Sequence, residues 1–574
     1  MNLEKSSKEW LYPGIACLAA IIVMLPIAVW GIPSGTDLPQ HFQFAHTYYD
    51  SLMSGDGFPN WSDKENIGYG GIGIRFYPPL SYYAMAFARI LTGNWFDAAW
   101  VTFTFWMVLG CLGVYYWARW WLSEKESAIA AVCYAVSPYH LGQLYVSFIY
   151  ADFAGAAVLP FCFAFLTRVL ERGKKSDVLG LAIAYAAMIL THLPTSIIGS
   201  FSIAVFSILL LKKGNYLRQI ARVSAGIGIG LAASSYYWFA MVSEMSWLNH
   251  AKEQYNSGHY YFGNRFFPAY FHTINTDFRP NALVSDILLV LCLLFLASSI
   301  VYLFYRKTKD AEVSNVARVF RLVLPLGVFA FFMITPLSFP IWKILMPLQK
   351  IQFPMRWMGV VSICGSIVTA AAVHFLLKGN FLKKRAWAYA AIIFPGIFLF
   401  LNFVYVWHPS AFIPIERESF ESELRELPYR QNYEFWWSVW SNEKALETKE
   451  KVLAGSREVV INDWQAEERI FTVESGTATT ARIAVFYYPH WQAIVNGTAV
   501  KVDKDENGVI LLPLPAERAT VKLIFKEPLP VRFATFVSIT VWMFIFFAVL
   551  VVWGGKLAYF RTPETYFAEE KFSC

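Results

Sequence analysis

Charged residues are scarce in this chain of 574 residues, in which Asp, Glu, Lys and Arg make up 16% and hydrophobic residues 56%. A soluble protein needs more charge to cover its surface, and apolar runs of about twenty residues recur here. The composition therefore excludes a soluble protein and predicts a polytopic helical membrane protein. The net charge of +7 does not indicate a nucleic-acid partner, because Lys and Arg mark the cytoplasmic loops of membrane proteins.

Cysteines are few and are unsuited to cross-linking. Six of the seven lie in apolar segments, one is the last residue, and none lies in the long polar region 408–530. The sequence therefore excludes a disulfide framework and a CxxC metal site. The cysteines are Cys17, Cys111, Cys133, Cys162, Cys292, Cys364 and Cys574.

Nucleotide-binding motifs are also missing. The chain contains no GxxxxGK[ST] sequence and no GxGxxG after a strand, and the glycine-rich "GYGGIGIRF" is not placed to open a helix. If the protein is an enzyme, its donor is therefore not a cytosolic nucleotide. We find no internal repeat of the kind that many transporters carry.

Long apolar runs predict twelve membrane spans. The first follows "MNLEKSSKEW", is long for a signal peptide and has no A-x-A-like cleavage site, so we expect an uncleaved anchor. With the N-terminus inside, Lys and Arg concentrate in the inner segments, which predicts that both termini are cytoplasmic. The expected spans are 11–30, 96–118, 127–141, 154–170, 178–194, 196–211, 219–241, 284–305, 319–337, 355–377, 386–407 and 531–555.

This topology places the unusual polar segments on the outer side. The first outside loop, 31–95, ends in an amphipathic stretch suited to the membrane interface. Region 408–530 alternates apolar and polar residues between Asn-Gly turn signals, which predicts a small extracytoplasmic β-sandwich. The aromatic stretch "YRQNYEFWWSVW" before it is expected at the membrane interface or beneath that domain.

Asp37 follows the first span in "TDLPQ". One interpretation is a helix N-cap, with Pro39 in the first turn and Gln40 at the capping-box position. The other is a general base at the outer surface, because a carboxylate can accept a proton from an attacking sugar hydroxyl. His41, four residues further on, would orient that base or help Asp37 and Asp152 to hold a metal. The two interpretations are compatible.

Two further ionisable residues lie at predicted outer ends of spans. Asp152 begins the fourth span, where an acid favours the helix dipole or adds a second acid to the same outer cavity. His192, in "LTHLPTS", is either held by a neighbouring helix or functional, since ionisable residues at membrane depth are functional candidates.

Basic residues are rare on the outer side, so "LQKIQFPMRW" stands out. Lys350, Gln352 and Arg356 either anchor the helix at the interface or clamp a lipid-linked phosphate, for which Arg offers a bidentate fork. Arg75, in "GIRFYPPL", is a weaker candidate for the same task.

These motifs, in this order and on this side, resemble the GT-C superfamily of membrane glycosyltransferases. "SGTDLPQH", "RFYPPLSYY", "LTHLPTS" and "IQFPMRW" look like a bacterial subgroup labelled 6-pyruvoyl-tetrahydropterin synthase-related. "YYPHWQAIVNG…LPLPAERATVKLIF" is similar to the outer β-domain that ends many of these chains. The resemblance implies a GT-C-like transmembrane domain over residues 1–407, a β-domain over 408–530 and a final helix and tail over 531–574, with about 12 membrane helices in all.

The resemblance also implies a function. Enzymes of this superfamily move a sugar from a polyprenyl-phosphate carrier to a glycan, lipid or protein acceptor at the outer face of the membrane, here the bacterial plasma membrane. It implies that Asp37 is the base and Asp152 the second-loop acid, with Lys350 and Arg356 on the lipid-phosphate side. Transfer would invert the anomeric configuration, and some relatives use a divalent metal. The competing class is a non-catalytic transporter or an envelope-assembly scaffold.

Overall fold

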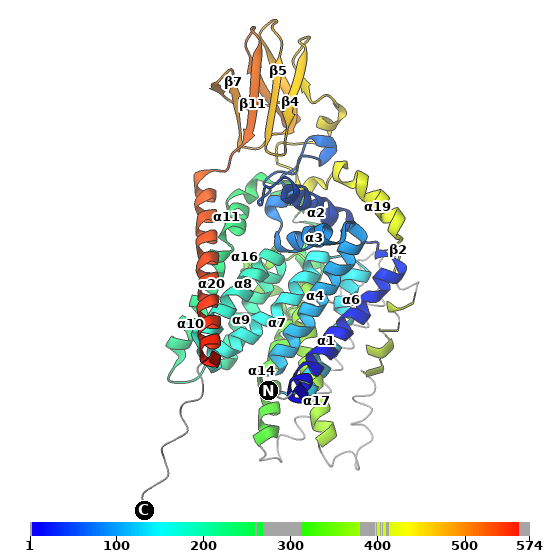
Figure 1. Cartoon of the computed structure of the whole chain (residues 1–574), viewed down its shortest axis with the longest axis vertical. Coiled ribbons are helices and arrows are strands. Elements are labelled where there is room, and N and C mark those ends of the chain that lie inside the picture. The colour runs from blue at the N-terminus through cyan, green and yellow to red at the C-terminus, as the bar shows by residue number, and fades with distance from the viewer. Residues whose placement is uncertain are drawn as a thin grey trace, which may run out of the picture.

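The computed structural model shows a helical bundle with two β-sheets above one end (Figure 1). It describes residues 3–255, 257–258, 261–267, 311–378, 396–397, 399–401, 403–404, 406–408 and 412–561.

Seven helices in the described ranges are long and apolar enough to cross a membrane. An eighth crossing would come from α10 (Tyr216–Ala233) and α11 (Ser235–Glu244), which meet at a bend of 74°. The seven are α1 (Leu3–Trp30), α4 (Trp95–Ala118), α7 (Tyr150–Glu171), α9 (Leu193–Leu210), α14 (Ala311–Phe332), α17 (Met358–Lys378) and α20 (Leu529–Arg561).

The predicted count of twelve spans is not confirmed. The expected span 127–141 is broken into α5 (Glu124–Ala135) and α6 (Pro138–Tyr145), because Ser137 precedes a proline and so leaves the helical conformation. The span expected at 178–194 is α8 (Lys175–Thr191), of 17 residues. The span 284–305, and much of 386–407, lie outside the described residues.

Short elements fill the end of the bundle that faces the sheets. The segment 31–95 contains a two-residue strand, two α-helices and two 3-10 helices, and α3 is the amphipathic stretch expected there. The short elements that precede the final domain are β1 (Ile32–Pro33), α2 (Leu38–Met53), η1 (Asn66–Gly68), η2 (Gly73–Phe76), α3 (Leu80–Thr92), η3 (Met245–Trp247), η4 (Asn249–Ala251), η5 (Glu253–Tyr255), η7 (Phe262–Asn264), η8 (Pro336–Ser338), α15 (Phe339–Ile344), α16 (Met346–Gln349) and η9 (Pro354–Trp357).

The helix predicted after Asp37 is confirmed, but its capping box is not. Asp37 holds the N-cap position of α2 and Pro39 lies in the first turn, yet the Asp37 side chain makes no capping hydrogen bond. Instead, the Asp37 backbone carbonyl accepts from the His41 N–H at 3.1 Å. The carboxylate is therefore not used to cap the helix.

A pair of two-residue strands joins the start of this loop to the far end of the chain. Ile32 and Pro33 in β1 pair antiparallel with Ile415 and Pro414 in β2 (Pro414–Ile415). Gly31 has a φ of +131°, and a Cβ there would lie 2.5 Å from the Ile415 carbonyl oxygen. Only glycine permits this approach.

The predicted β-rich C-terminal region is confirmed, with two antiparallel sheets ordered β3-β6-β10-β9 and β4-β5-β11-β7-β8. The Asn496-Gly497 turn joins β7 to β8 with positive φ at both residues, as a two-residue hairpin requires. Short helices precede the sheets. The bounds are α19 (Arg417–Glu426), η11 (Leu427–Tyr429), η12 (Glu434–Trp436), η13 (Glu443–Glu447), β3 (Val452–Leu453), β4 (Val459–Trp464), β5 (Glu468–Val473), β6 (Thr479–Phe486), β7 (Trp491–Val495), β8 (Thr498–Val500), β9 (Asp503–Lys504), β10 (Val509–Leu514) and β11 (Ala519–Phe525).

Candidate functional site

Asp152, His192 and Arg356 meet where α7, α9 and η9, just before α17, converge. Asp152 lies in the first turn of α7, and His192 ends α8 and caps α9. The Thr195 hydroxyl donates to Asp152 Oδ1 at 3.1 Å and lies 2.9 Å from His192 Nδ1, which is itself 3.4 Å from the same carboxylate oxygen. The two ionisable residues predicted at the outer ends of spans therefore belong to one buried cluster.

Gly155 makes this contact possible. It lies one turn after Asp152, and a Cβ at this position would lie 2.9 Å from His192 Cβ and 3.0 Å from Thr195 Oγ1. Small residues allow membrane helices to approach closely. Gly155 therefore sets the distance between α7 and the start of α9.

The second oxygen of Asp152 has a different environment. Asp152 Oδ2 is buried without a hydrogen bond among the described residues, and it lies 3.6 Å from Arg356 Nε. Arg356 is held from the other side, because its Nη1 donates to the Ile351 carbonyl at 2.7 Å. A buried acceptor without a hydrogen bond is costly, so Asp152 Oδ2 is suited to a group that this chain does not supply.

Asp37 is half-buried and close to the same guanidinium. Burial raises the pKa of Asp37 above its usual range, while the hydrogen bond from Thr36, at 3.2 Å, and the charge of Arg356 oppose the shift. A carboxylate that holds a proton more readily than usual is a better general base near neutral pH.

The Tyr77 hydroxyl feels the charges of both acids. Burial raises the pKa of Tyr77, the charges of Asp37 and Asp152 add to that shift, and the charge of Arg356 opposes it. All three ionisable groups thus act on one phenol. Tyr77 was missed from the sequence, although it belongs to the "RFYPPLSYY" motif.

His41 is enclosed by aromatic rings, and no interaction joins its side chain to Asp37. Its Nδ1 lies 2.7 Å from the Tyr82 hydroxyl, while Nε2 is buried without a hydrogen bond among the described residues. Burial, helped by His192, lowers the pKa of His41 to about 3. His41 is therefore a neutral imidazole at physiological pH.

Two guanidinium groups lie against one aromatic ring of the predicted basic segment. The guanidinium groups of Arg356 and Arg265 lie 5.2 Å and 5.6 Å from the Phe353 ring, and Lys350 is exposed at the end of α16. Gln352 has a φ of +64°, which residues other than glycine rarely adopt. Backbone strain of this kind is often found at functional sites. Arg265 was missed because nothing in its local sequence marks it.

Arg75 is not part of this cluster. It lies in a buried network with two carboxylates: it donates to Glu244 twice, and its Nη2 donates to Glu527 at 2.8 Å. The Tyr488 hydroxyl and His490 Nε2 reach the same Glu244 at 2.7 Å and 3.0 Å. Arg75 is thus paired with two carboxylates of this chain and links the segment 31–95 to α11 and the sheets, while its phosphate role stays a prediction.

The predicted metal ligands Asp37, His41 and Asp152 do not form a group suited to a metal. In the described ranges, the one set of three ligand side chains with donor atoms within 4.8 Å of one another is Glu244, His490 and Glu527. The Arg75 guanidinium already bridges both of these carboxylates. This set therefore fits an ion-pair network better than it fits a metal.

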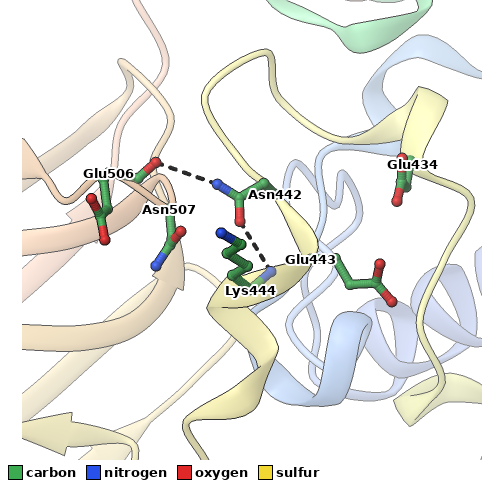
Figure 2. Close-up of a pocket in the computed structure, with 6 residues that line it drawn as sticks. All are labelled: Glu434, Asn442, Glu443, Lys444, Glu506 and Asn507. Carbon is green, nitrogen blue, oxygen red and sulfur yellow. Dashed lines mark hydrogen bonds between the residues drawn. The ribbon is translucent and has the colours of Figure 1, made fainter.

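A separate polar cavity of about 510 Å³ opens between the β9–β10 turn and the segment before β3 (Figure 2). Asn442 reaches across it, because its side-chain amide donates to the Glu506 carbonyl at 3.3 Å. None of the predicted site residues lines this cavity, whose lining is Glu434, Asn442, Glu443, Lys444, Glu506 and Asn507.

The aromatic stretch expected at the membrane interface or beneath the β-domain contacts the Asp37 side of the site. The Tyr433 hydroxyl donates to the Thr36 carbonyl at 2.9 Å, next to Asp37. The Trp436 ring lies 5.4 Å from Tyr77. Tyr433 and Trp436 were not singled out from the sequence, because their partners Thr36 and Tyr77 lie 397 and 359 residues earlier in the chain.

Three solved structures are similar to this chain over about 70% of its length. The apo oligosaccharyltransferase of Archaeoglobus fulgidus is 13% identical, with a TM-score of 0.39 and coverage of 72% of this chain and 57% of that one. ArnT from Cupriavidus metallidurans, bound to undecaprenyl phosphate, is 12% identical, with a TM-score of 0.32 and coverage of 71% and 90%. Mycobacterial arabinofuranosyltransferase AftD is 13% identical, with a TM-score of 0.42 and coverage of 70% and 27%.

This chain therefore spans little more than half of the archaeal enzyme. It matches no curated protein. The family model described as "6-pyruvoyl-tetrahydropterin synthase related domain; membrane protein" matches residues 74–408, which is more than half of the chain. The chain therefore belongs to the 6-pyruvoyl-tetrahydropterin synthase-related family of membrane proteins.

Proposed function

We propose that the protein is a GT-C-type glycosyltransferase that moves a sugar from a polyprenyl-phosphate carrier to a glycan, lipid or protein acceptor. The observation that carries this proposal is the pair of acids around one guanidinium. Asp37 is a half-buried carboxylate with a raised pKa, and Asp152 Oδ2 lies 3.6 Å from Arg356 without a hydrogen bond. A base, a hydrogen-bond acceptor and a cation side by side suit transfer to a hydroxyl.

In this reaction Asp37 accepts the proton of the acceptor hydroxyl. The hydroxyl oxygen forms a bond to the anomeric carbon as the bond from that carbon to the phosphate oxygen breaks, and the electron pair leaves with the phosphate. Attack opposite the leaving group inverts the anomeric configuration. Asp152 Oδ2 holds a sugar hydroxyl, and the neutral His192 or its protonated form keeps Asp152 in place.

The leaving phosphate gains charge and needs cations. Arg356 and Arg265 supply them beside Phe353, the exposed Lys350 adds a third cation in the same segment, and Gln352 adds an amide donor. Positive groups that are in place before the reaction stabilise the charge that develops in the transition state.

The arrangement of the chain supports transfer at the outer face. The start of α1 and the end of α20 lie at the end of the bundle opposite the sheets (Figure 1). This agrees with the proposed topology, in which both termini are cytoplasmic and region 408–530 lies outside the plasma membrane. The cluster lies at the sheet end, where such an enzyme meets its acceptor.

The test uses the purified protein in proteoliposomes with radiolabelled undecaprenyl-phosphate sugars and a crude envelope acceptor. Asp37→Asn should lower transfer about 100-fold or more, because the base is lost. Asp50→Asn is the matched control, since Asp50 lies on the same helix but pairs with Lys64 at 2.6 Å. Unchanged transfer by Asp37→Asn would contradict the role of Asp37 as the base.

Two further outcomes bear on the class of protein and on metal. Movement of intact carrier across the bilayer without transfer would indicate a transporter. The same assay with EDTA tests the predicted metal.

A further inference from the structure

Residues 429–440 form a strap across the outer end of the bundle. On one side the strap is fixed to the first outside loop. The Asn432 amide donates to Glu65 at 2.7 Å, the Asn432 N–H donates to the Asn66 side chain at 2.8 Å, and Gln43 donates to the Arg430 carbonyl at 3.1 Å. These buried bonds fix the register of the strap against α2 and η1.

On its other side the strap is fixed to the segment after α11. The Val439 N–H donates to the Trp247 carbonyl at 2.8 Å, and the Asn249 N–H donates to the Trp437 carbonyl at 3.0 Å. The Asn249 side chain also donates to the Glu434 carbonyl at 3.0 Å. The strap thus has a defined conformation on both sides.

Four rings gather on the strap and its neighbour. Tyr433 and Phe435 are parallel at 5.3 Å, and Trp436 and His250 are nearly parallel at 5.9 Å. Phe435 lies 5.3 Å from Trp436. Tyr433 is 43% exposed and the other three are half-buried, so ring surface is presented to the outside. We call these four residues the aromatic rim.

The aromatic rim extends from the proposed base to the proposed phosphate site. At one end the Tyr433 hydroxyl donates to Thr36, the neighbour of Asp37, at 2.9 Å. At the other end His250 Nε2 lies 3.5 Å from Gln352 Nε2, and the nearby charge of Lys350 adds to burial in lowering the pKa of His250. A ligand that lies along the rim therefore extends from the proposed base, Asp37, to the proposed phosphate site at Gln352 and Lys350.

We propose that the aromatic rim binds the ring of the sugar that is attached to the carrier. This inference rests on the proposed function and names the part of the donor that the rim contacts. In the proposed reaction the transferred sugar lies between the base that activates the acceptor and the cations that hold the phosphate. One face of a sugar ring presents mostly C–H groups, which pack on aromatic faces while the hydroxyls bond to polar groups at the edge.

The experiment compares the affinity of the protein in nanodiscs for undecaprenyl phosphate, undecaprenyl-phosphate glucose and undecaprenyl-phosphate arabinose. Wild type should bind one glycosylated carrier about 10-fold more tightly than the bare carrier, since each aromatic contact contributes a few-fold. The double variant Tyr433→Ala/Phe435→Ala should lose this preference and keep its affinity for the bare carrier. Tyr433→Phe should keep the preference, because it retains the ring.

Tyr429→Ala is the matched control, because this exposed tyrosine belongs to the same strap and lies beside Lys64. If the double variant also binds bare carrier poorly, Phe435→Leu takes its place, because it removes one ring and retains most of the apolar bulk. The measured quantity is again the ratio of the affinity for a glycosylated carrier to that for the bare carrier. Equal affinities in wild type, or a preference that survives the loss of the rings, would overturn the inference. A preference for a glycosylated carrier without any sugar transfer would instead overturn the proposed reaction and support the rim.

Discussion

Arg75 and Glu244 form a bidentate pair in which Nε and Nη2 of the arginine each donate to one carboxylate oxygen at 2.7 Å. Both side chains are buried, and Glu527, just before α20, shares the guanidinium. The pair therefore joins η2, in the segment between α1 and α4, to α11 and to the residues that follow the sheets.

Arg75→Ala should lower the free energy of unfolding by about 3–5 kcal/mol, because two carboxylates lose their buried cation. Arg417→Ala should cost about 1 kcal/mol or less, since Arg417 pairs with Asp97 at the exposed surface. Thermal unfolding in detergent would compare the two variants. Similar losses would show that the buried pair is not what holds these segments together.

Asp37→Asn should remove activity and yet raise stability at neutral pH. A raised carboxyl pKa in the folded state means that protonation favours folding, so the ionised form costs stability as pH rises through that pKa. Removing the charge should stabilise by about 0.5–2 kcal/mol, as at other strained functional sites. Unfolding temperatures of wild type and variant at pH 4 and pH 7.5 would show a difference only at the higher pH. A variant less stable at both would contradict this.

Gly155→Ala tests the close approach of α7 to His192 and Thr195. The added Cβ would force these side chains apart, and we expect a loss of about 1–3 kcal/mol together with reduced transfer. Gly228→Ala in α10 is the matched control, because its Cβ would meet no atom within 4 Å. That change should leave stability equal or raise it by up to about 1 kcal/mol. Equal effects of the two changes would show that the approach is unimportant.

His41 should make the protein acid-sensitive. Its pKa of about 3 in the folded state lies below the value of about 6.5 in the unfolded chain, so the unfolded state binds the extra proton first. Its contribution is therefore complete above about pH 6.5 and is lost as pH falls towards 3. His41→Gln, which still offers Tyr82 a polar partner, should unfold at temperatures that change less between pH 7.5 and pH 4.5. An unchanged pH dependence would place the acid sensitivity elsewhere.

The sequence predicts well what depends on neighbouring residues. The helix after Asp37 and the Asn496-Gly497 hairpin follow from local signals, and both are present. The distribution of Lys and Arg among the loops also predicted that Asp152, His192 and Arg356 lie on one side of the membrane, and the structure brings the three together. Their catalytic roles stay predictions.

Long-range pairing could not be predicted in this way. Arg75 looked available because Glu244 and Glu527 lie far along the chain and carry no local signal. The predicted capping box is wrong because an Asp side chain can accept from several nearby donors. Here Asp37 accepts from the Thr36 hydroxyl and does not cap α2. Tyr433 donates to the Thr36 carbonyl across a separation of 397 residues, which no local pattern indicates.

The strand pair β1–β2 has a consequence for how the protein matures. Ile32 and Pro33 are made at the start of synthesis, but Pro414 and Ile415, with which they pair, emerge late. A nascent chain halted at residue 408 would already contain Asp37, Asp152 and Arg356, but it would lack both the second strand and the strap. The β1–β2 pair can therefore form only after residue 415 has been made, and an unfinished chain in the membrane lacks both this pair and the strap beside Asp37.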